Sequence, residues 1–135
     1  MRPLTGKASC NLNTMTWMSL SIVIALLLVL LWFKRGTRIS SKTAADYLRN
    51  GAVVIDVRSA GEFTANHLPK AINIPLSEID SVISRKVSNK NQVLLLHCQS
   101  GMRSSQAVSR LKALGYANAF NLGSYDRAAQ IVSAR

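Results

Sequence analysis

The hydrophobic pattern divides the chain into one long apolar run and a longer stretch in which short apolar runs alternate with polar segments. The long run, TMTWMSLSIVIALLLVLLWF at residues 14–33, contains no charged residue. At about 1.5 Å per residue, a helix of this length spans about 30 Å, which matches the hydrocarbon core of a bilayer. The pattern predicts an N-terminal tail at 1–13, a transmembrane helix at 14–33, a linker at 34–40 and a globular domain at 41–135.

The flanks of residues 14–33 favour a retained anchor over a cleaved signal peptide. Trp17 and Trp32 lie near the two ends of the run, where aromatic residues of a membrane interface are expected. A signal peptide has a shorter apolar core and small residues at its cleavage site, whereas this run ends in Leu-Trp-Phe-Lys-Arg. We therefore expect a single-pass protein of the inner or cell membrane. More basic residues follow the run than precede it, which predicts a cytoplasmic globular domain.

Strands and helices are predicted to alternate after the linker. Apolar runs predict strands at 52–57, 71–74, 93–96 and 119–122, and residues 38–40 are a candidate edge strand. Apolar residues at helical spacing predict helices at 41–49, 59–66, 77–85, 104–114 and 125–132, with Ser41 or Thr43 capping the first and Ser77 capping the third. This alternation predicts an α/β domain: an open, largely parallel sheet with helices on both faces. Sites in such sheets form beyond the carboxyl ends of the strands.

Charge and cysteine content restrict the classes of function. The net charge of +11 favours anionic substrates and anionic lipid headgroups. No nucleic-acid partner is expected, because the chain has no recognition-helix pattern, no aromatic stacking set and no dense Lys/Arg run. The two cysteines do not form a disulfide framework, and no Cys-x-x-C motif or His/Cys cluster indicates a metal, so we expect neither metal nor cofactor. Cys98 is therefore predicted to be a free thiol.

The candidate chemistry lies in residues 92–106, QVLLLHCQSGMRSSQ. Cys98 follows a predicted strand and precedes a predicted helix, whose free N–H groups and partial positive charge favour a thiolate and lower its pKa. Gly101 lets the loop turn sharply, so that successive N–H groups can point at one centre. Arg103 can close this ring with its guanidinium, and Ser104 offers a hydroxyl at the helix start. We therefore predict Cys98 to be the nucleophile.

Two stretches carry the motifs of a known family. They are VVIDVRSAGEFTANHLPKAINIP at residues 53–75 and HCQSGMRS at residues 97–104. The first resembles the N-terminal signature of single-domain rhodaneses, which are sulfurtransferases, and the second resembles their active-site loop. The resemblance covers residues 38–135 and implies a rhodanese-like fold. It implies that Cys98 takes a sulfane sulfur from a donor such as thiosulfate or a persulfide, becomes a persulfide itself, and passes the sulfur to a thiol or another thiophilic acceptor.

The resemblance also assigns roles to further residues. The residues implied to hold the anionic substrate and the persulfide are Gln99, Ser100, Gly101, Met102, Arg103 and Ser104. Asp56 and Arg58 match positions in the wall of the active site, where we expect supporting hydrogen bonds, and Glu62 and His67 are expected to be structural. The loop has no basic residue besides Arg103. This favours a persulfide on a protein or small thiol over the thiosulfate dianion as the natural donor.

The sequence departs from the family pattern at several positions. Glycines are common in the family where this chain has Asn66 and Lys70. Asn tolerates the left-handed conformation, so the first replacement is expected to cost little. Ser124 stands where a second glycine is usual, and Ala128 and Ala129 lie near the usual place of an aromatic residue. These changes could loosen or widen one wall of the pocket.

Three alternatives to sulfur transfer depend on the same loop. Cysteine phosphatases have five residues between Cys and Arg, whereas Gln99–Met102 supplies four, and on the family resemblance the shorter loop favours sulfur over phosphate. A catalytically weak binding module at the membrane is disfavoured because inactive members typically lack the cysteine. A buried core cysteine is also disfavoured, because Cys98 follows the strand rather than lying within it. The sequence does not indicate an oligomeric state.

Overall fold

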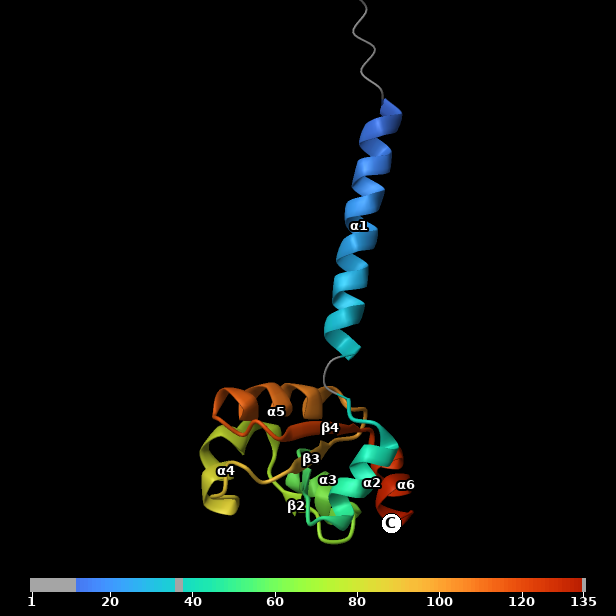
Figure 1. The fold of residues 1–135 in the computed structure, drawn as a ribbon. Coiled ribbons are helices and arrows are strands. Elements are labelled where there is room, and N and C mark those ends of the chain that lie inside the picture. Colours follow the sequence, from blue (N-terminus) through green and yellow to red (C-terminus); the bar gives the residue numbers. More distant parts are fainter. Residues whose placement is uncertain (1–11, 36–37, 135) are drawn as a thin grey trace, which may run out of the picture. The chain divides into compact units, whose positions relative to one another are not determined.

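The chain divides into two compact units, Met1–Gly36 and Thr37–Arg135. The computed structural model describes the backbone of residues 12–35 and 38–134, and the side chains of residues 17–30 and 38–134. In the first unit, helix α1 spans Leu12–Arg35 (Figure 1). Within the described residues, no helix combines the length and the apolar content that crossing a bilayer requires. The predicted span 14–33 includes residues 14–16 and 31–33, whose side chains lie outside the described part.

The second unit alternates strands and helices in the predicted order. Its strands are β1 (Val53–Asp56), β2 (Ile72–Asn73), β3 (Leu94–His97) and β4 (Ala119–Gly123). Its helices are α2 (Ser41–Arg49), α3 (Ala60–Ala65), α4 (Ile79–Lys86), α5 (Met102–Ala113) and α6 (Tyr125–Ser133), with a short 3-10 helix, η1 (Leu76–Glu78), before α4. The prediction of an alternating α/β domain is confirmed.

The four strands form one parallel sheet in the order β2-β1-β3-β4. In the central pair, Val53 of β1 lies opposite Leu94 of β3, and Asp56 lies opposite His97. Both strands therefore end at the same edge of the sheet, so the segments that follow Asp56 and His97 emerge side by side. The predicted strand at 38–40 contributes only an isolated parallel bridge between Arg38 and β4.

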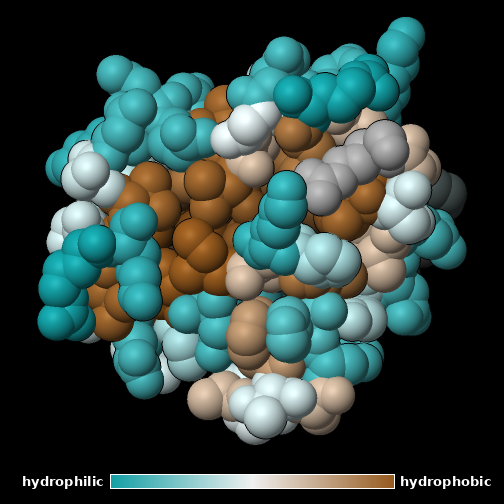
Figure 2. Space-filling model, turned by 90° about the horizontal axis from the view of Figure 1, so that it is seen from below, coloured by the Kyte–Doolittle hydropathy of each residue, from teal (hydrophilic) through white to brown (hydrophobic). Residues whose placement is uncertain are grey.

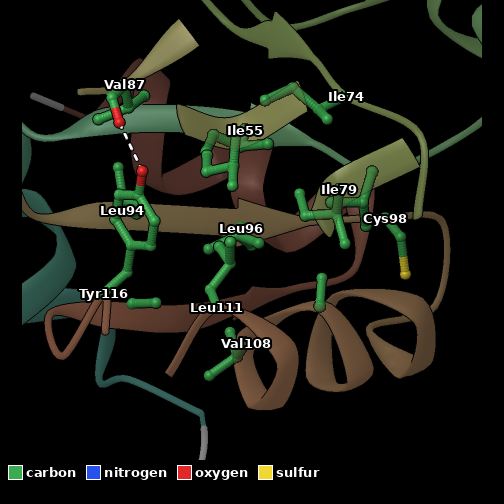
Figure 3. Close-up of a cluster of buried hydrophobic side chains, with 14 residues drawn as sticks. Ile55, Ile74, Ile79, Val87, Leu94, Leu96, Cys98, Val108, Leu111 and Tyr116 are labelled. Atoms are coloured by element: carbon green, nitrogen blue, oxygen red, sulfur yellow. Dashed lines mark hydrogen bonds between the residues drawn. The ribbon is translucent and has the colours of Figure 1, made fainter. Parts of the chain in front are cut away.

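Alternate residues of the central strands face opposite sides of the sheet, because successive side chains of a strand point to opposite faces. Ile55, Leu94 and Leu96 pack with α4 and α5 in one buried cluster, which Figure 3 shows in close-up. Val54 and Leu95 pack with α2 and α6 in a second cluster. A strand buried on both faces needs apolar residues at every position, which explains the continuous runs in the sequence.

The second cluster is less completely covered than the first. Nine partly buried hydrophobic residues pack against it, compared with four for the first cluster. Figure 2 shows a face of the molecule on which apolar residues gather in the centre, within a ring of polar residues. Apolar side chains therefore reach the surface on this face instead of being wholly enclosed.

Two helix caps differ from the predicted ones. Ser40, not Ser41, caps α2, and its hydroxyl accepts the N–H of Thr43 at 3.1 Å. Thr43 is itself inside the helix. Ser77, the predicted cap of α4, lies within η1 instead, and α4 begins at Ile79 without a side-chain cap. The Pro75 that precedes η1 cannot donate a backbone hydrogen bond, and the chain first makes one 3-10 turn before it settles into the α-helix.

Helix α5 begins two residues earlier than predicted. Gly101 precedes it with φ 92°, a left-handed conformation that glycine adopts readily, and Met102 is already helical. Ser104 therefore lies in the first turn of the helix, not at its start. At the other end, α5 stops at Ala113, one residue before the predicted end at Leu114, and the side chain of Leu114 is 38% exposed.

The left-handed residue of the loop between α3 and β2 is Lys70. Its φ is 61°, and no other non-glycine residue in the described part of the chain has a positive φ. Asn66 is extended instead, with φ −160° and ψ 144°, so its tolerance of the left-handed region is not used. A left-handed conformation costs a residue with a Cβ atom about 1–2 kcal/mol, so Lys70 carries local strain.

Candidate active site

The loop after β3 wraps its backbone around the sulfur of Cys98. Gly101 donates its N–H to Sγ at 3.0 Å, and the hydroxyl of Ser104 lies 3.7 Å from the same atom. The loop is fixed to the end of β4, because the N–H of Cys98 donates to the carbonyl of Gly123 at 3.3 Å. The N–H of Tyr125, at the start of α6, donates to the carbonyl of Gln99 at 3.4 Å. The loop is therefore held from a second strand and a second helix.

Cys98 is fully buried and belongs to the first apolar cluster (Figure 3). The expectation that it would not be a buried cysteine is therefore wrong, because the first turn of α5 closes over the residue after the strand. Burial of the sulfur opposes its ionisation. Hydrogen bonds from the backbone and hydroxyl of Ser104, and from the N–H groups of Ser100 and Gly101, outweigh burial. The pKa of the Cys98 thiol is consequently lowered from its ordinary value.

A buried amide on β4 holds this loop in shape. Asn121 is 4% exposed, and its side-chain N–H donates to the carbonyl of Gly101 at 3.0 Å. Its Oδ1 accepts from the hydroxyl of Ser104 at 2.8 Å and from the N–H of Gly123 at 2.9 Å. Sequence reasoning did not single out Asn121. A polar residue inside an otherwise apolar parallel strand, two residues before its carboxyl end, was the signal that could have found it.

Arg103 forms a two-point ion pair with Glu62. Its Nη1 lies 2.8 Å from Oε2 and its Nη2 lies 2.9 Å from Oε1. Glu62 also accepts the N–H of Ser59 at 2.9 Å, which completes a capping box at the start of α3. Arg103, and after it Ser59, hold the pKa of Glu62 far below its usual range, while Glu62 raises the pKa of Arg103. The cation of the loop therefore has its counter-ion within the protein.

Asp56 and Arg58 form a buried pair beside the loop. The Nη2 of Arg58 lies 2.7 Å from Oδ2 of Asp56, and its Nε lies 3.0 Å from both carboxylate oxygens. Arg58 also donates to the backbone carbonyl of Asn66 at 2.7 Å, and its guanidinium lies over the ring of Tyr125, 4.5 Å from the centroid. The hydrogen bond to Asp56 raises the pKa of Arg58 against the effect of burial. Both residues are placed to support the wall rather than to reach the sulfur.

The remaining predicted residues lie at the rim or away from it. Gln99 and Ser100 are exposed, and Met102 is 69% exposed, so these three side chains border the approach to the loop. His67 lies in the loop after α3, where its ring stacks on Phe63 with the centroids 4.2 Å apart. Among the described residues, no group of three or more His, Cys, Asp or Glu side chains could hold a metal ion.

Residues 40–128 match the family of the Rhodanese-like domain. The chain belongs to this family. It is 38% identical over 69 residues to the thiosulfate sulfurtransferase PspE of Escherichia coli, a match that covers 51% of this chain and 66% of PspE. It is 34% identical over 82 residues to the human thiosulfate:glutathione sulfurtransferase, covering 52% of this chain and 71% of that protein. The solved structure of the human single-domain sulfurtransferase TSTD1 superposes with a TM-score of 0.60 at 29% identity, covering 70% of this chain and 96% of that one.

The region that matches the rhodanese-like family includes the candidate site. The parallel sheet with helices on both faces is the rhodanese-like α/β fold. The matched residues 40–128 contain β1, the Asp56–Arg58 pair and the complete Cys98 loop. The N-terminal helix lies outside the matched region.

Proposed function

We propose that this chain is a sulfurtransferase that carries a sulfane sulfur as a persulfide on Cys98. One observation carries the proposal: the sulfur of Cys98 receives the N–H of Gly101 at 3.0 Å, inside a loop that lowers the pKa of the thiol. A thiolate is the nucleophilic form of cysteine, and the lowered pKa of Cys98 favours it. The sulfurtransferase names of the relatives support the same reaction class.

In the first step, the thiolate of Cys98 attacks the outer sulfur of the donor. A bond forms between Sγ and that sulfur, while the donor's own S–S bond breaks and the donor leaves with the electron pair, as a thiolate or as sulfite. The product is a persulfide on Cys98. The N–H groups of Ser100, Gly101 and Ser104 that favour the thiolate are also suited to a negative terminal sulfur.

In the second step, an acceptor thiolate attacks the terminal sulfur of the persulfide. The bond between the two sulfurs of the persulfide breaks, and Cys98 leaves as a thiolate. The enzyme returns to its starting state, and no external oxidant or reductant is consumed. Because Cys98 is fully buried, the loop must move for either partner to reach its sulfur.

We propose a persulfide on a small thiol or a protein as the natural donor, in preference to thiosulfate. Arg103 is the basic residue within the loop, and Glu62 neutralises it through a two-point ion pair. A dianion gains little from a cation that is already paired. The exposed apolar side chain of Met102 at the rim suits the carbon skeleton of a thiol better than a sulfite group.

The full-length protein in neutral detergent tests this function. We expect a mass increase of one sulfur atom after incubation with a small-molecule persulfide, and loss of that mass on adding a thiol. Turnover from thiosulfate to cyanide should be slower than turnover from the persulfide. Cys98→Ser should abolish both reactions, and undiminished turnover in that variant would exclude the mechanism. Release of phosphate from an aryl phosphate that depends on Cys98 would favour the phosphatase alternative.

We also propose that residues 14–33 anchor the domain in the inner or cell membrane. Helix α1 has 24 residues, which at 1.5 Å each gives about 36 Å. Its described apolar side chains are exposed on all sides, from Trp17 to Leu30. The hydroxyl of Ser21 donates to the carbonyl of Met18 at 2.8 Å, so this polar group has a partner inside the helix.

Cell fractionation and a reporter fused after Arg135 test the anchor and its orientation. We expect the protein in the membrane fraction, resistant to extraction with salt or alkali, and a reporter that is active in the cytoplasm. Replacing Leu26 and Leu28 by Lys should release the protein, because each charge at the centre of a span costs about 3 kcal/mol. Extraction of the unaltered chain by alkali would contradict the proposal.

A further inference from the structure

We propose that Arg38 and Arg127, with the pocket between α2 and α6, form a binding site for a phosphate group on a small apolar body. The guanidinium of Arg38 lies against Gly123, on which the Cys98 loop is anchored, and against Gly101 of that loop. The pocket beside Arg127 is lined by residues of α2 and α6 and by Ala134, and none of these belongs to the Cys98 loop.

The two guanidinium groups meet at Gly123. A Cβ atom placed on Gly123 would lie 3.6 Å from Nη1 of Arg127 and 3.7 Å from Nε of Arg38. A Cβ atom placed on Gly101 would lie 3.4 Å from Nη2 of Arg38. Glycine at both positions therefore leaves the space that the guanidinium groups occupy.

No carboxylate in the described part of the chain compensates the charges of Arg38 and Arg127. Neither Arg38 nor Arg127 forms an ion pair in the described part of the chain. Arg127 donates to two backbone carbonyls, to Ile39 at 2.7 Å and to Leu122, which use only some of its five N–H groups and carry no net charge. Burial, and after it the charge of Arg38, lowers the pKa of Arg127. Two like charges held together in this way favour an anion beside them.

A pocket of about 190 Å³ adjoins Arg127. Its polar lining comes from Ser41, Arg127 and Gln130, and its apolar lining comes from Ala45, Ile131 and Ala134. The hydroxyl of Ser41 accepts a hydrogen bond from Arg127 at 3.3 Å, so its proton remains available to a ligand. The pocket has several times the space that a single water needs.

The lining defines the class of ligand. Guanidinium groups bind phosphate oxygens with charge-assisted hydrogen bonds, and the N-terminal turn of α2, which contains Ser41, adds a partial positive charge. The small apolar wall fits a few carbon atoms attached to the phosphate. A free phosphate ester and a phospholipid headgroup share this chemistry, and the experiment separates them.

Binding is measured on the full-length protein in neutral detergent, with two probes: inorganic phosphate and dihexanoyl phosphatidic acid below its micellar concentration. The Nε–Hε resonances of Arg38 and Arg127 report on the proposed site, and the amide of Gly101 reports on the Cys98 loop. We expect both arginine resonances to shift with at least one probe. Shifts confined to Gly101 would overturn the proposal, since the anion would then occupy the active-site loop alone.

Variants test the site without disturbing the fold. Arg38→Gln keeps the backbone bridge to Asn121 and should weaken binding about tenfold, because one charge-assisted contact is lost. Arg85→Gln, on the exposed face of α4, matches the change in net charge and should bind as the unaltered protein does. Equal affinity in Arg38→Gln and the unaltered protein would overturn the proposal.

Filling the pocket distinguishes the two sources of phosphate. Ala45→Leu leaves both arginines in place and occupies the apolar part of the pocket. If the lipid probe binds and Ala45→Leu abolishes its binding, the site takes a phospholipid headgroup. If inorganic phosphate binds equally well in Ala45→Leu, the site takes a free phosphate group. Both results support the site, and absence of shifts at Arg38 and Arg127 with either probe overturns it.

Discussion

Both carboxylate oxygens of Glu62 are bound to the guanidinium of Arg103, at 2.8 and 2.9 Å. The pair connects helix α3 to the first turn of α5, across 41 positions of sequence. It places a neutral ion pair where the loop around Cys98 would otherwise present a free cation. The donor preference that we propose therefore depends partly on Glu62, a residue outside the loop.

Glu62→Gln should improve the use of thiosulfate. The substitution leaves Arg103 without its counter-ion, so its charge can attract the dianion. A gain of about 1 kcal/mol, as expected for charges near a surface, corresponds to a KM for thiosulfate that is about fivefold lower. The KM for a persulfide of an uncharged thiol should stay the same. Steady-state kinetics with the two donors measure the difference.

Ser59→Ala is the matched control for Glu62→Gln. It removes the other half of the capping box at α3 but leaves the pair of Glu62 with Arg103 in place. Loss of the cap should cost about 1 kcal/mol of stability, without a change in the KM for thiosulfate. If both variants changed that KM equally, the effect would come from loosening of α3 and not from the charge of Arg103.

Ser104→Ala should raise the pKa of the Cys98 thiol. The hydroxyl of Ser104 lies 3.7 Å from Sγ and contributes to lowering its pKa, while burial of the sulfur opposes ionisation. The rate of alkylation by iodoacetamide as a function of pH measures the thiolate. We expect the midpoint to move to higher pH, because one of the hydrogen bonds that lower the pKa of the thiol is lost. Ser109→Ala, exposed on the same helix, should not move it.

The lowered pKa of Cys98 also links stability to pH. An acidic group whose pKa is lower in the folded state stabilises that state above its unfolded pKa, which for cysteine is about 8.5. This contribution disappears as the pH falls through the lower folded pKa. Urea unfolding at a series of pH values measures the free energy of unfolding of the unaltered protein and of Cys98→Ser. As the pH rises through this window, the unaltered protein should gain stability relative to Cys98→Ser. A difference that is independent of pH would contradict the lowered pKa.

The sequence predicted the strands and helices of the second unit well, because local signals determine them. Apolar runs bounded by turn residues located β1 and β3 within one or two residues. The errors lie where tertiary contacts, and not the local sequence, determine the backbone conformation. The left-handed residue is Lys70 and not Asn66, because the path of the chain into β2 determines which residue must turn. Gly101 starts α5 early, because its contact with Gly123 fixes the loop from a distant strand.

The candidate site could be predicted only in part for the same reason. Cys98 and its loop are contiguous in sequence, so the strand, the glycine and the helix start identified them. The residues that hold the loop, Asn121 and Glu62, are 20 and 41 positions away from their partners Gly101 and Arg103. Only the register of the parallel sheet and the packing of α3 bring them together. The burial of Cys98 likewise depends on α5 closing over the end of β3.

Lys70→Gly should stabilise the protein by about 0.5–1 kcal/mol. Lys70 has φ 61°, where a Cβ atom is strained, and glycine relieves that strain at some cost in the entropy of the unfolded chain. Thermal unfolding followed by circular dichroism measures the gain. Lys70→Ala removes the charge but keeps the Cβ atom, so it should give no gain. If both variants stabilised the protein equally, charge and not backbone strain would be the cause.

Asp56→Asn should destabilise the protein far more than a surface substitution of the same kind. Arg58 is 2% exposed, and Asp56 supplies its counter-charge through three contacts of 2.7 to 3.0 Å. Removing one partner of a buried ion pair leaves the other charge uncompensated, at a cost of about 3–5 kcal/mol. Unfolding by urea, followed by circular dichroism, measures this loss.

Asp46→Asn is the matched control, because Asp46 forms an exposed ion pair with Arg49. This variant should lose less than about 1 kcal/mol of the free energy of unfolding. Losses of similar size in the two variants would mean that Arg58 finds water or another acceptor when Asp56 is neutral. If the expected difference is found, the pair is a structural support: Arg58 lies over the ring of Tyr125, whose N–H donates to the carbonyl of Gln99 in the Cys98 loop. Persulfide formation on whatever fraction of Asp56→Asn remains folded should then proceed at the normal rate, since neither Asp56 nor Arg58 contacts the sulfur.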